Sequence, residues 1–142
     1  MRIGIAGIAG RMGRLLAEEV TAAGATLAGG TVRPGSGKAP PPGVPLLPDA
    51  AALFEASDVV IDFTHAEEAV PHAALAARAG KGLVLGSSGL NAAQERAVAE
   101  AAAGVPIVYA ANFSPGVNIV LALAERMAAL LPAAGYDAEI VE

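Results

Sequence analysis

Short runs of apolar residues alternate along the chain with longer alanine-rich stretches. The apolar runs predict strands over residues 3–6, 26–32, 59–63, 83–85, 107–110 and 138–141. The alanine-rich stretches predict helices over residues 11–23, 50–56, 67–78, 92–103 and 115–131, and Asn91 with Gln94 forms the pattern of a capping box. Continuous apolar strands that alternate with helices are typical of a parallel sheet buried on both faces. We therefore expect an α/β protein with a doubly wound parallel sheet.

Proline breaks the pattern in two places. Residues 34–48 are rich in proline and predict a loop. Thr64 and Glu67 have the spacing of a capping box, but a helix from Thr64 would place Pro71 in its interior, where proline removes a hydrogen bond and clashes. We therefore expect the main helix to begin near Glu68, after a turn.

Composition excludes several classes of function. The 142 residues suit one domain, or one domain with the start of a second, and the net charge of -5 includes no basic stripe for nucleic acid. The absence of cysteine excludes disulfides, thiolate metal sites and thiol catalysis. No apolar run reaches the roughly 18 residues of a membrane span, and glycines and Arg11 interrupt the N-terminal apolar stretch. We expect a cytoplasmic protein without a metal, nucleic-acid or membrane partner.

The segment that follows the first predicted strand carries the most specific motif. It reads Gly7, Ile8, Ala9, Gly10, Arg11, Met12 and Gly13, and it opens a predicted helix. Free N–H groups and the helix dipole favour pyrophosphate at such an N-terminus, and glycine lets the backbone approach the phosphates. The spacing differs from the commoner G-x-G-x-x-G because Ala9 takes the second glycine position. A tight turn with close packing is the alternative, but the context favours a Rossmann-type dinucleotide site.

The end of the second predicted strand bears on the choice of nucleotide. NAD sites usually place an acidic residue there for the ribose 2′-hydroxyl, whereas this chain has Val32 followed by Arg33. An arginine can pair with a 2′-phosphate, although a solvated loop arginine is the alternative. We expect NADPH as the preferred cofactor and NADH as a second one, with Lys38 as a further candidate in the same loop.

Two further segments follow strands, at the edge where open α/β sheets bind ligands. They are Gly86, Ser87, Ser88 and Gly89, and Ala110, Ala111, Asn112 and Phe113. Their small residues suit contact with a nicotinamide ring, and each also fits an ordinary turn. His65 is a candidate contact for adenine, and His72 is expected on a helix surface. The sequence offers no proton donor or substrate clamp, so no catalytic residue is assigned.

Together these motifs resemble the 4-hydroxy-tetrahydrodipicolinate reductase family, also called dihydrodipicolinate reductase. The segments that carry the resemblance are 7–13, 60–64, 86–89, 110–118 and 139–142. The resemblance implies reduction of a cyclic dicarboxylate, 4-hydroxy-tetrahydrodipicolinate, by NADPH or NADH in lysine and diaminopimelate biosynthesis. It assigns residues 7–12 to the pyrophosphate, Arg33 to the 2′-phosphate, and residues 86–88 and 110–113 to the nicotinamide end. Val32 stands where many relatives carry glutamate, which favours NADPH.

The resemblance also implies a division into two domains. Residues 1–112 correspond to an NAD(P)-binding Rossmann domain, and residues 113–142 to the hinge, helix and first strand of a substrate and tetramerisation domain. In the family a His-His-Arg-His-Lys segment supplies the proton donor and the substrate lysine, and it lies beyond Glu142. We expect the full-length protein to be a homotetrameric oxidoreductase. We expect these 142 residues alone to bind cofactor, as a monomer or weak oligomer, without turnover.

Two alternatives stay open at this point. Another nicotinamide-dependent oxidoreductase would share the glycine loop but would not need residues 112–116 beside a hinge. A non-catalytic nucleotide-binding module would bind the cofactor without transferring a hydride.

Overall fold

The structure, a computed structural model, describes residues 1–131, 135, 136 and 139. The chain divides into two compact units, Met1–Ala111 and Asn112–Glu142. Apart from Glu139, the strand predicted over residues 138–141 lies outside the described residues. Among those that are described, no helix is long and apolar enough to cross a lipid bilayer.

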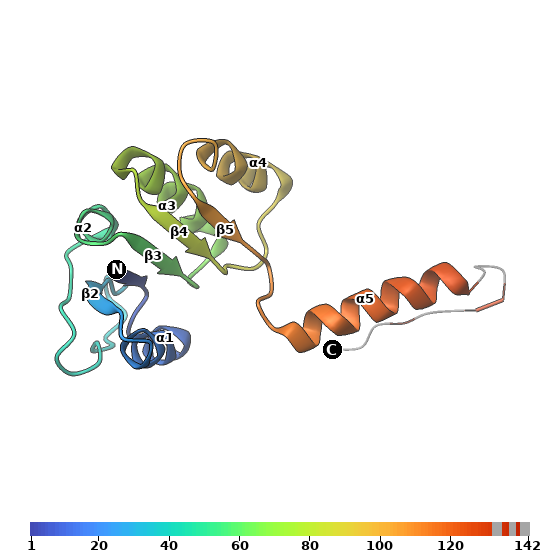
Figure 1. Cartoon of the computed structure of the whole chain (residues 1–142), viewed down its shortest axis with the longest axis horizontal. Helices are drawn as coiled ribbons and strands as arrows, with labels where there is room; N and C mark the ends of the chain where they lie inside the picture. Colours follow the sequence, from blue (N-terminus) through green and yellow to red (C-terminus); the bar gives the residue numbers. More distant parts are fainter. Residues whose placement is uncertain (132–134, 137–138, 140–142) are drawn as a thin grey trace. The chain divides into compact units, whose positions relative to one another are not determined.

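The first unit is built on a parallel sheet, as the sequence predicts. In the described part of the chain five strands form it, in the order β2-β1-β3-β4-β5 (Figure 1). The strands are β1 Arg2–Ala6, β2 Thr26–Gly30, β3 Val59–Asp62, β4 Gly82–Leu85 and β5 Ile107–Tyr109. From β1 the chain moves first to β2 at one edge and then to β3 on the other side, so the sheet has its switch point between β1 and β3. Open α/β sheets bind ligands at the carboxyl ends of the strands at this point.

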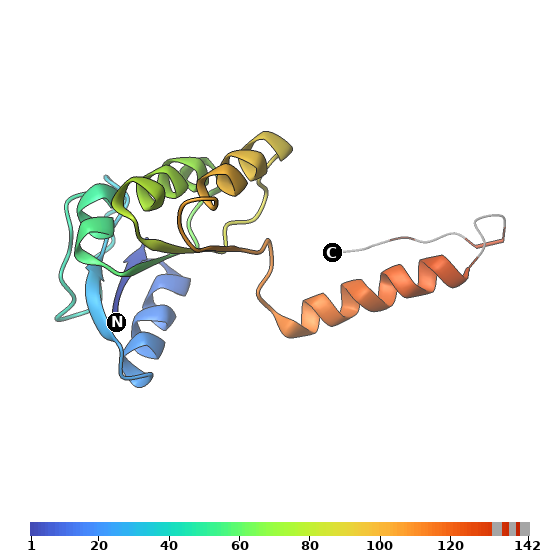
Figure 2. The same ribbon diagram turned by 45° about the horizontal axis from the view of Figure 1, so that its top comes forward.

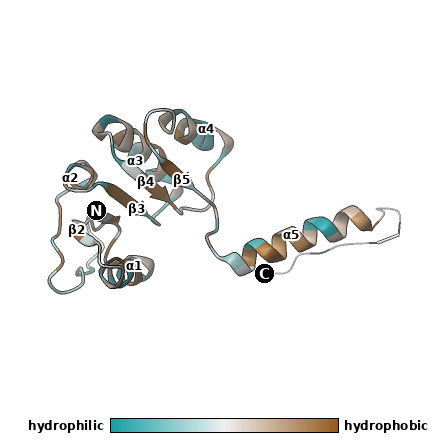
Figure 3. Cartoon of the chain, in the orientation of Figure 1, coloured by the Kyte–Doolittle hydropathy of each residue, from teal (hydrophilic) through white to brown (hydrophobic). Residues whose placement is uncertain are grey.

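Helices cover both faces of the sheet. They are α1 Arg11–Ala22, α2 Ala50–Ala56, α3 Ala66–Ala79 and α4 Ala92–Ala101. The helices α2, α3 and α4 lie on one face, and α1 lies on the opposite face (Figure 2). Most of the central strand β3 and much of β4 and β5 are hydrophobic (Figure 3). This arrangement is a Rossmann-like doubly wound fold, as the alternation of apolar runs and helices predicts.

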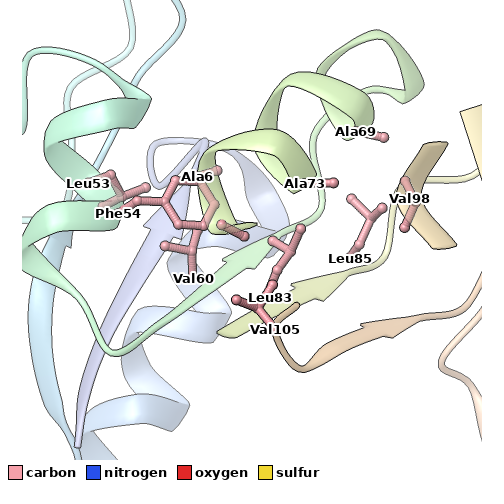
Figure 4. Packing of buried hydrophobic residues seen from close by; sticks show 11 residues of the cluster. Ala6, Leu53, Phe54, Val60, Ala69, Ala73, Leu83, Leu85, Val98 and Val105 are labelled. Atoms are coloured by element: carbon pink, nitrogen blue, oxygen red, sulfur yellow. The ribbon is translucent and has the colours of Figure 1, made fainter. Parts of the chain in front are cut away.

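Two apolar clusters hold these layers together. On the face of α2, α3 and α4, the large buried side chains Phe54 and Leu85 pack with three alanines of α3, Ala69, Ala73 and Ala76 (Figure 4). The alanines recur at intervals of four and three residues, so they form one small apolar stripe that lets α3 approach the strands closely. The cluster under α1 comprises Ile3, Ile5, Ile8, Ala17 and Val20. Because Ile8 belongs to this cluster, the core also fixes the loop that follows β1.

The start of α3 corrects one sequence prediction. The helix begins at Ala66 rather than near Glu68, and Pro71 lies inside it. Pro71 cannot donate the backbone hydrogen bond that the carbonyl of Glu67 would accept. Pro71 and Glu67 are both exposed, so water can satisfy that carbonyl, and the buried face of α3 compensates for the lost bond.

The second unit contains the helix α5, Pro115–Leu130. Its N-terminus has the predicted form, because the Ser114 hydroxyl accepts a hydrogen bond of 3.4 Å from the N–H of Val117 and Pro115 stands in the first turn. The side-chain amide of Asn118 donates bonds of 3.0 Å to the carbonyl of Asn112 and 2.9 Å to that of Ser114. The segment that leads into α5 is therefore held by its own local hydrogen bonds.

Candidate functional site

The loop between β1 and α1 is a tight turn whose glycines are required by geometry. Gly7 has a φ of +69°, a left-handed conformation that favours glycine, and its carbonyl accepts a 2.9 Å bond from the N–H of Gly10. A Cβ on Gly13 would lie 2.6 Å from Cα of Ile8, so only glycine lets α1 pack this closely on the loop. These contacts explain Gly7 and Gly13 by packing alone, as the tight-turn alternative proposed. Evidence for a ligand therefore has to come from the surroundings of the loop.

The N-terminus of α1 provides the first such evidence. Among the described helices, α2, α4 and α5 each have a side-chain cap, from Asp49, Asn91 and Ser114, whereas α1 and α3 have none. The N-cap of α1 is Gly10, which has no side chain and makes no capping bond. The first-turn N–H groups of α1 are therefore left for water or a ligand, and an anion suits them best.

A cavity opens directly in front of this helix end. Its volume is about 800 Å³, within the range of small-molecule and cofactor sites. The β1–α1 loop, the segment after β2, the start of α2 and the β3–α3 connection all contribute to its wall. The cavity thus lies at the carboxyl ends of β1 and β3, the switch point of the sheet.

Three cationic side chains line the cavity, together with the carboxylates of Asp49 and Glu68. Arg11, Arg33 and Lys38 all line it. The last two belong to the segment after β2, which is ordered by a 3.1 Å bond from the N–H of Ser36 to the carbonyl of Arg33. The N–H of Lys38 donates a 3.4 Å bond to the Ser36 hydroxyl. Three cations beside an uncapped helix N-terminus suit a ligand with more than one phosphate.

The cavity is also lined by a buried polar group whose position the sequence analysis predicted wrongly. His72 was expected on a helix surface, but its side chain is buried and lines the cavity. Its Nδ1–H donates a 2.6 Å hydrogen bond to Oδ2 of Asp62, which is fully buried at the end of β3. Phe54 of α2 packs edge-on against the imidazole, with ring centroids 6.1 Å apart. The sheet and two helices together therefore bury a histidine that its position in α3 alone would leave exposed.

Asp62 is ionised in this setting. Burial by itself would raise the pKa of its carboxyl group, but hydrogen bonds from His72 and Thr64 outweigh burial and lower the pKa below its ordinary value. Thr64 contributes both its N–H, at 2.7 Å, and its hydroxyl, at 2.6 Å, to Oδ1. Both oxygens of the carboxylate are therefore occupied by donors.

The structure brings together one part of the predicted site. The cavity is lined by six of the residues assigned to the site, Gly7, Ala9, Gly10, Arg11, Met12 and Arg33, and also by the two further candidates Lys38 and His65. Ile8 is an exception in the glycine loop, because its side chain is fully buried in the core under α1 and its N–H donates to the carbonyl of Thr31. Only backbone atoms of Ile8 remain for contact with a ligand.

The other predicted residues do not line this cavity. They follow β4 and β5 and comprise Gly86, Ser87, Ser88, Ala110 and Ala111, with Asn112 and Phe113 in the second unit. Gly86 is close to the cavity wall, since a Cβ there would overlap the ring of Phe63, which does line it. The hydroxyl of Ser87 is buried and has no hydrogen-bond partner among the described residues. A buried hydroxyl without a hydrogen-bond partner is uncommon, so this turn is a candidate position for contact with a polar ligand.

Several residues of the cavity were not predicted. They are Ser36, Asp49, Thr64, Glu68 and His72, and Asp62 lies directly behind them. Asp62 left one signal in the sequence, because a carboxylate ends an otherwise apolar strand. A buried acid rarely lacks a partner, and a search of the following helix could have identified His72 as that partner.

Comparison with solved structures identifies the type of fold. An Erwinia carotovora atroseptica structure matches with a TM-score of 0.66 at 22% identity, over 78% of this chain and 35% of that one. The UDP-N-acetylglucosamine 3-dehydrogenase of Acidithiobacillus ferrooxidans matches with a TM-score of 0.60 at 23% identity, over 75% of this chain and 37% of that one. The fold is accordingly a Rossmann-type fold.

Sequence comparison then identifies the family. Residues 1–113 match the model of the N-terminus of dihydrodipicolinate reductase, and the chain belongs to this family. It is 60% identical over 142 residues to the 4-hydroxy-tetrahydrodipicolinate reductase of Granulibacter bethesdensis, covering 100% of this chain and 54% of the relative. The corresponding reductase of Acidiphilium cryptum is 54% identical over 142 residues, covering 100% of this chain and 52% of the relative. The chain spans about half the length of the curated relatives that it matches.

Proposed function

We propose that this chain is the cofactor-binding part of a 4-hydroxy-tetrahydrodipicolinate reductase and that it binds NADPH in the cavity at the switch point. The proposal rests on one observation. The uncapped N-terminus of α1 and the side chains of Arg11, Arg33 and Lys38 all border the same cavity. Family membership supports the same conclusion. The phosphates of a nicotinamide dinucleotide suit the three cations that line this cavity.

Each part of the cavity has a role in this proposal. The backbone of residues 7–12 binds the pyrophosphate through the first-turn N–H groups of α1, which no side chain caps, because the N–H groups of Ile8 and Gly10 already donate to the carbonyls of Thr31 and Gly7. Arg33 binds the 2′-phosphate through its planar guanidinium. Only Thr31 and Val32 lie between the end of β2 and Arg33, and neither is acidic, so a 2′-hydroxyl lacks its usual partner there. NADPH is therefore preferred, and NADH binds more weakly.

The turns after β4 and β5 are proposed for the nicotinamide end. They comprise residues 86–88 and 110–113. The buried hydroxyl of Ser87, which has no partner within the described part of the chain, supports a polar ligand at this position. When bound, the nicotinamide supplies a hydride for reduction of a cyclic dicarboxylate substrate. The residues of this chain bind and orient the cofactor, and none of them is assigned as proton donor.

Titration of the chain with NADPH and NADH tests this proposal. Arg33→Ala should weaken NADPH binding by about ten- to a hundred-fold, because it removes a hydrogen-bonded ion pair, and should change NADH binding little. Arg96→Ala is a matched control, since Arg96 is exposed on α4 and does not line the cavity. Equal effects of the two substitutions, or no binding of either nucleotide, would show the proposal to be wrong.

A further inference from the structure

The Asp62 network links three parts of the first unit. Asp62 ends β3, Thr64 lies in the connection to α3, and His72 lies on the second turn of α3. His72 Nδ1 is 2.6 Å from Oδ2, and the Thr64 N–H and hydroxyl are 2.7 and 2.6 Å from Oδ1. These short bonds to a carboxylate fix the connection relative to the buried face of α3.

The same connection packs on the glycine loop. A Cβ on Gly7 would lie 2.8 Å from Cγ2 of Thr64, so the threonine methyl is in close contact with the turn after β1. Thr64 and Gly7 both line the cavity. The glycine loop therefore packs against the side chain of Thr64, whose position depends on its hydrogen bonds to Asp62.

Stability alone does not account for a polar group at this depth. A buried carboxylate and imidazole both lose hydration, and apolar residues of similar volume often stabilise a core as well or better. Glu68 is the other charged group near the ring, with Oε2 at 3.9 Å from Nε2, which is too long for a hydrogen bond. Unlike apolar packing, the hydrogen bonds of this network fix the orientation of the Thr64 backbone and side chain.

We propose that His72 is a positioning residue for the cofactor cavity, holding Thr64 against the glycine loop through the carboxylate of Asp62. This inference rests on the proposed function, because it assigns the network to the same nucleotide site. His72 acts through Asp62 and Thr64, and its own contact with the ligand is not required. The fixed Thr64 keeps the turn at Gly7 in the conformation that presents its backbone to the pyrophosphate.

Isosteric substitutions separate the hydrogen bond from the volume of the side chain. In His72→Asn the amide nitrogen takes the place of Nδ1 and can still donate to Asp62, whereas His72→Leu fills similar space without a donor. We expect His72→Leu to raise the Kd for NADPH about ten-fold and His72→Asn to stay within about three-fold of the unsubstituted chain. The exchange rate of the Thr64 amide hydrogen should rise in His72→Leu and remain slow in His72→Asn.

A second variant tests the other end of the network and does not alter the helix. Thr64→Val keeps a methyl group beside Gly7 but removes the hydroxyl that donates to Asp62. We expect it to raise the Kd for NADPH about five-fold. If His72→Leu does not fold, the Kd of Thr64→Val for NADPH tests the proposed role of the network by itself.

The outcomes distinguish the two proposals. If the unsubstituted chain fails to bind NADPH, the proposed function is wrong and this inference falls with it. If the unsubstituted chain binds NADPH but folded His72→Leu binds equally well, or Thr64→Val does, the inference alone is wrong. Equal weakening in His72→Leu and His72→Asn would also overturn it, because the hydrogen bond would then not be what positions the loop.

Discussion

The guanidinium of Arg14 donates a 2.8 Å hydrogen bond to the carbonyl oxygen of Ala39. Arg14 lies on α1, and Ala39 lies in the proline-rich loop that follows β2. The same loop carries Arg33 and Lys38, which line the cavity, whereas Arg14 does not line it. The bond therefore attaches the cationic loop to the helix whose N-terminus opens on the cavity.

Loss of the bond between Arg14 and Ala39 should change nucleotide selectivity without removing a residue that contacts the nucleotide. We predict that Arg14→Ala raises the Kd for NADPH about two- to five-fold, since an exposed hydrogen bond contributes about 0.5–1 kcal/mol. The Kd for NADH should change less, because the 2′-phosphate is what the loop is proposed to bind. Calorimetric titration with both nucleotides measures this ratio, and Arg78→Ala, on the exposed surface of α3, serves as the control. An unchanged ratio of the two Kd values in Arg14→Ala would show that the attachment does not order the loop.

The close approach of α1 to the glycine loop predicts a large effect of a single methyl group. Gly13→Ala places a Cβ 2.6 Å from Cα of Ile8, and backbone atoms cannot move aside easily. We expect the free energy of unfolding to fall by about 1–3 kcal/mol. Gly104→Ala is the matched control, since the nearest atom to its Cβ would be the carbonyl oxygen of Ala101 at 3.9 Å. Urea denaturation of both variants provides the comparison, and equal stability of the two would contradict the packing described here.

The lowered pKa of Asp62 predicts how stability depends on pH. The folded chain holds this pKa below its ordinary value of 3.8, through the bonds from His72 and Thr64. The unfolded chain therefore binds more protons in acid, and the stabilisation is complete above the ordinary value and is lost as pH falls through the folded pKa. We expect the difference in unfolding free energy between the unsubstituted chain and Asp62→Asn to shrink as pH is lowered from about 6 to about 3. A difference that stays constant over this range would mean that Asp62 is not ionised in the folded chain.

Local sequence signals predicted the fold well. The capping box at Asn91 and Gln94 is present, with the Asn91 side chain accepting from the N–H of Gln94 at 3.0 Å and the Gln94 side chain accepting from that of Asn91 at 2.9 Å. The α/β alternation gave the parallel sheet, because apolar strands and their crossover helices leave few other arrangements. Such features depend on residues within one turn of each other or on a strong hydrophobic pattern.

The misplaced residues depend on contacts between distant elements. His72 is buried because Phe54 of α2 and Asp62 of β3 surround it, and neither lies within its own helical turns. The proline rule gave the wrong start for α3 because it considers only the lost bond at Pro71 and not the buried alanines that hold the helix to the sheet. The glycine loop and Arg33, which the sequence predicts as site residues, line the cavity. Thr64 and Ser36 line it as well but were not predicted, because the wall is assembled from four separate segments.

Backbone amide chemical shifts, followed during an NADPH titration, locate the nucleotide on the chain. We expect saturable shifts at residues 7–13, at Arg33 and at Thr64, while the amides in the middle of α4 stay unchanged. NADH should produce the same pattern with a weaker Kd and a smaller change at Arg33. Shifts confined to other surfaces, or no saturable shift in the glycine loop, would contradict the assignment of this cavity as the cofactor site.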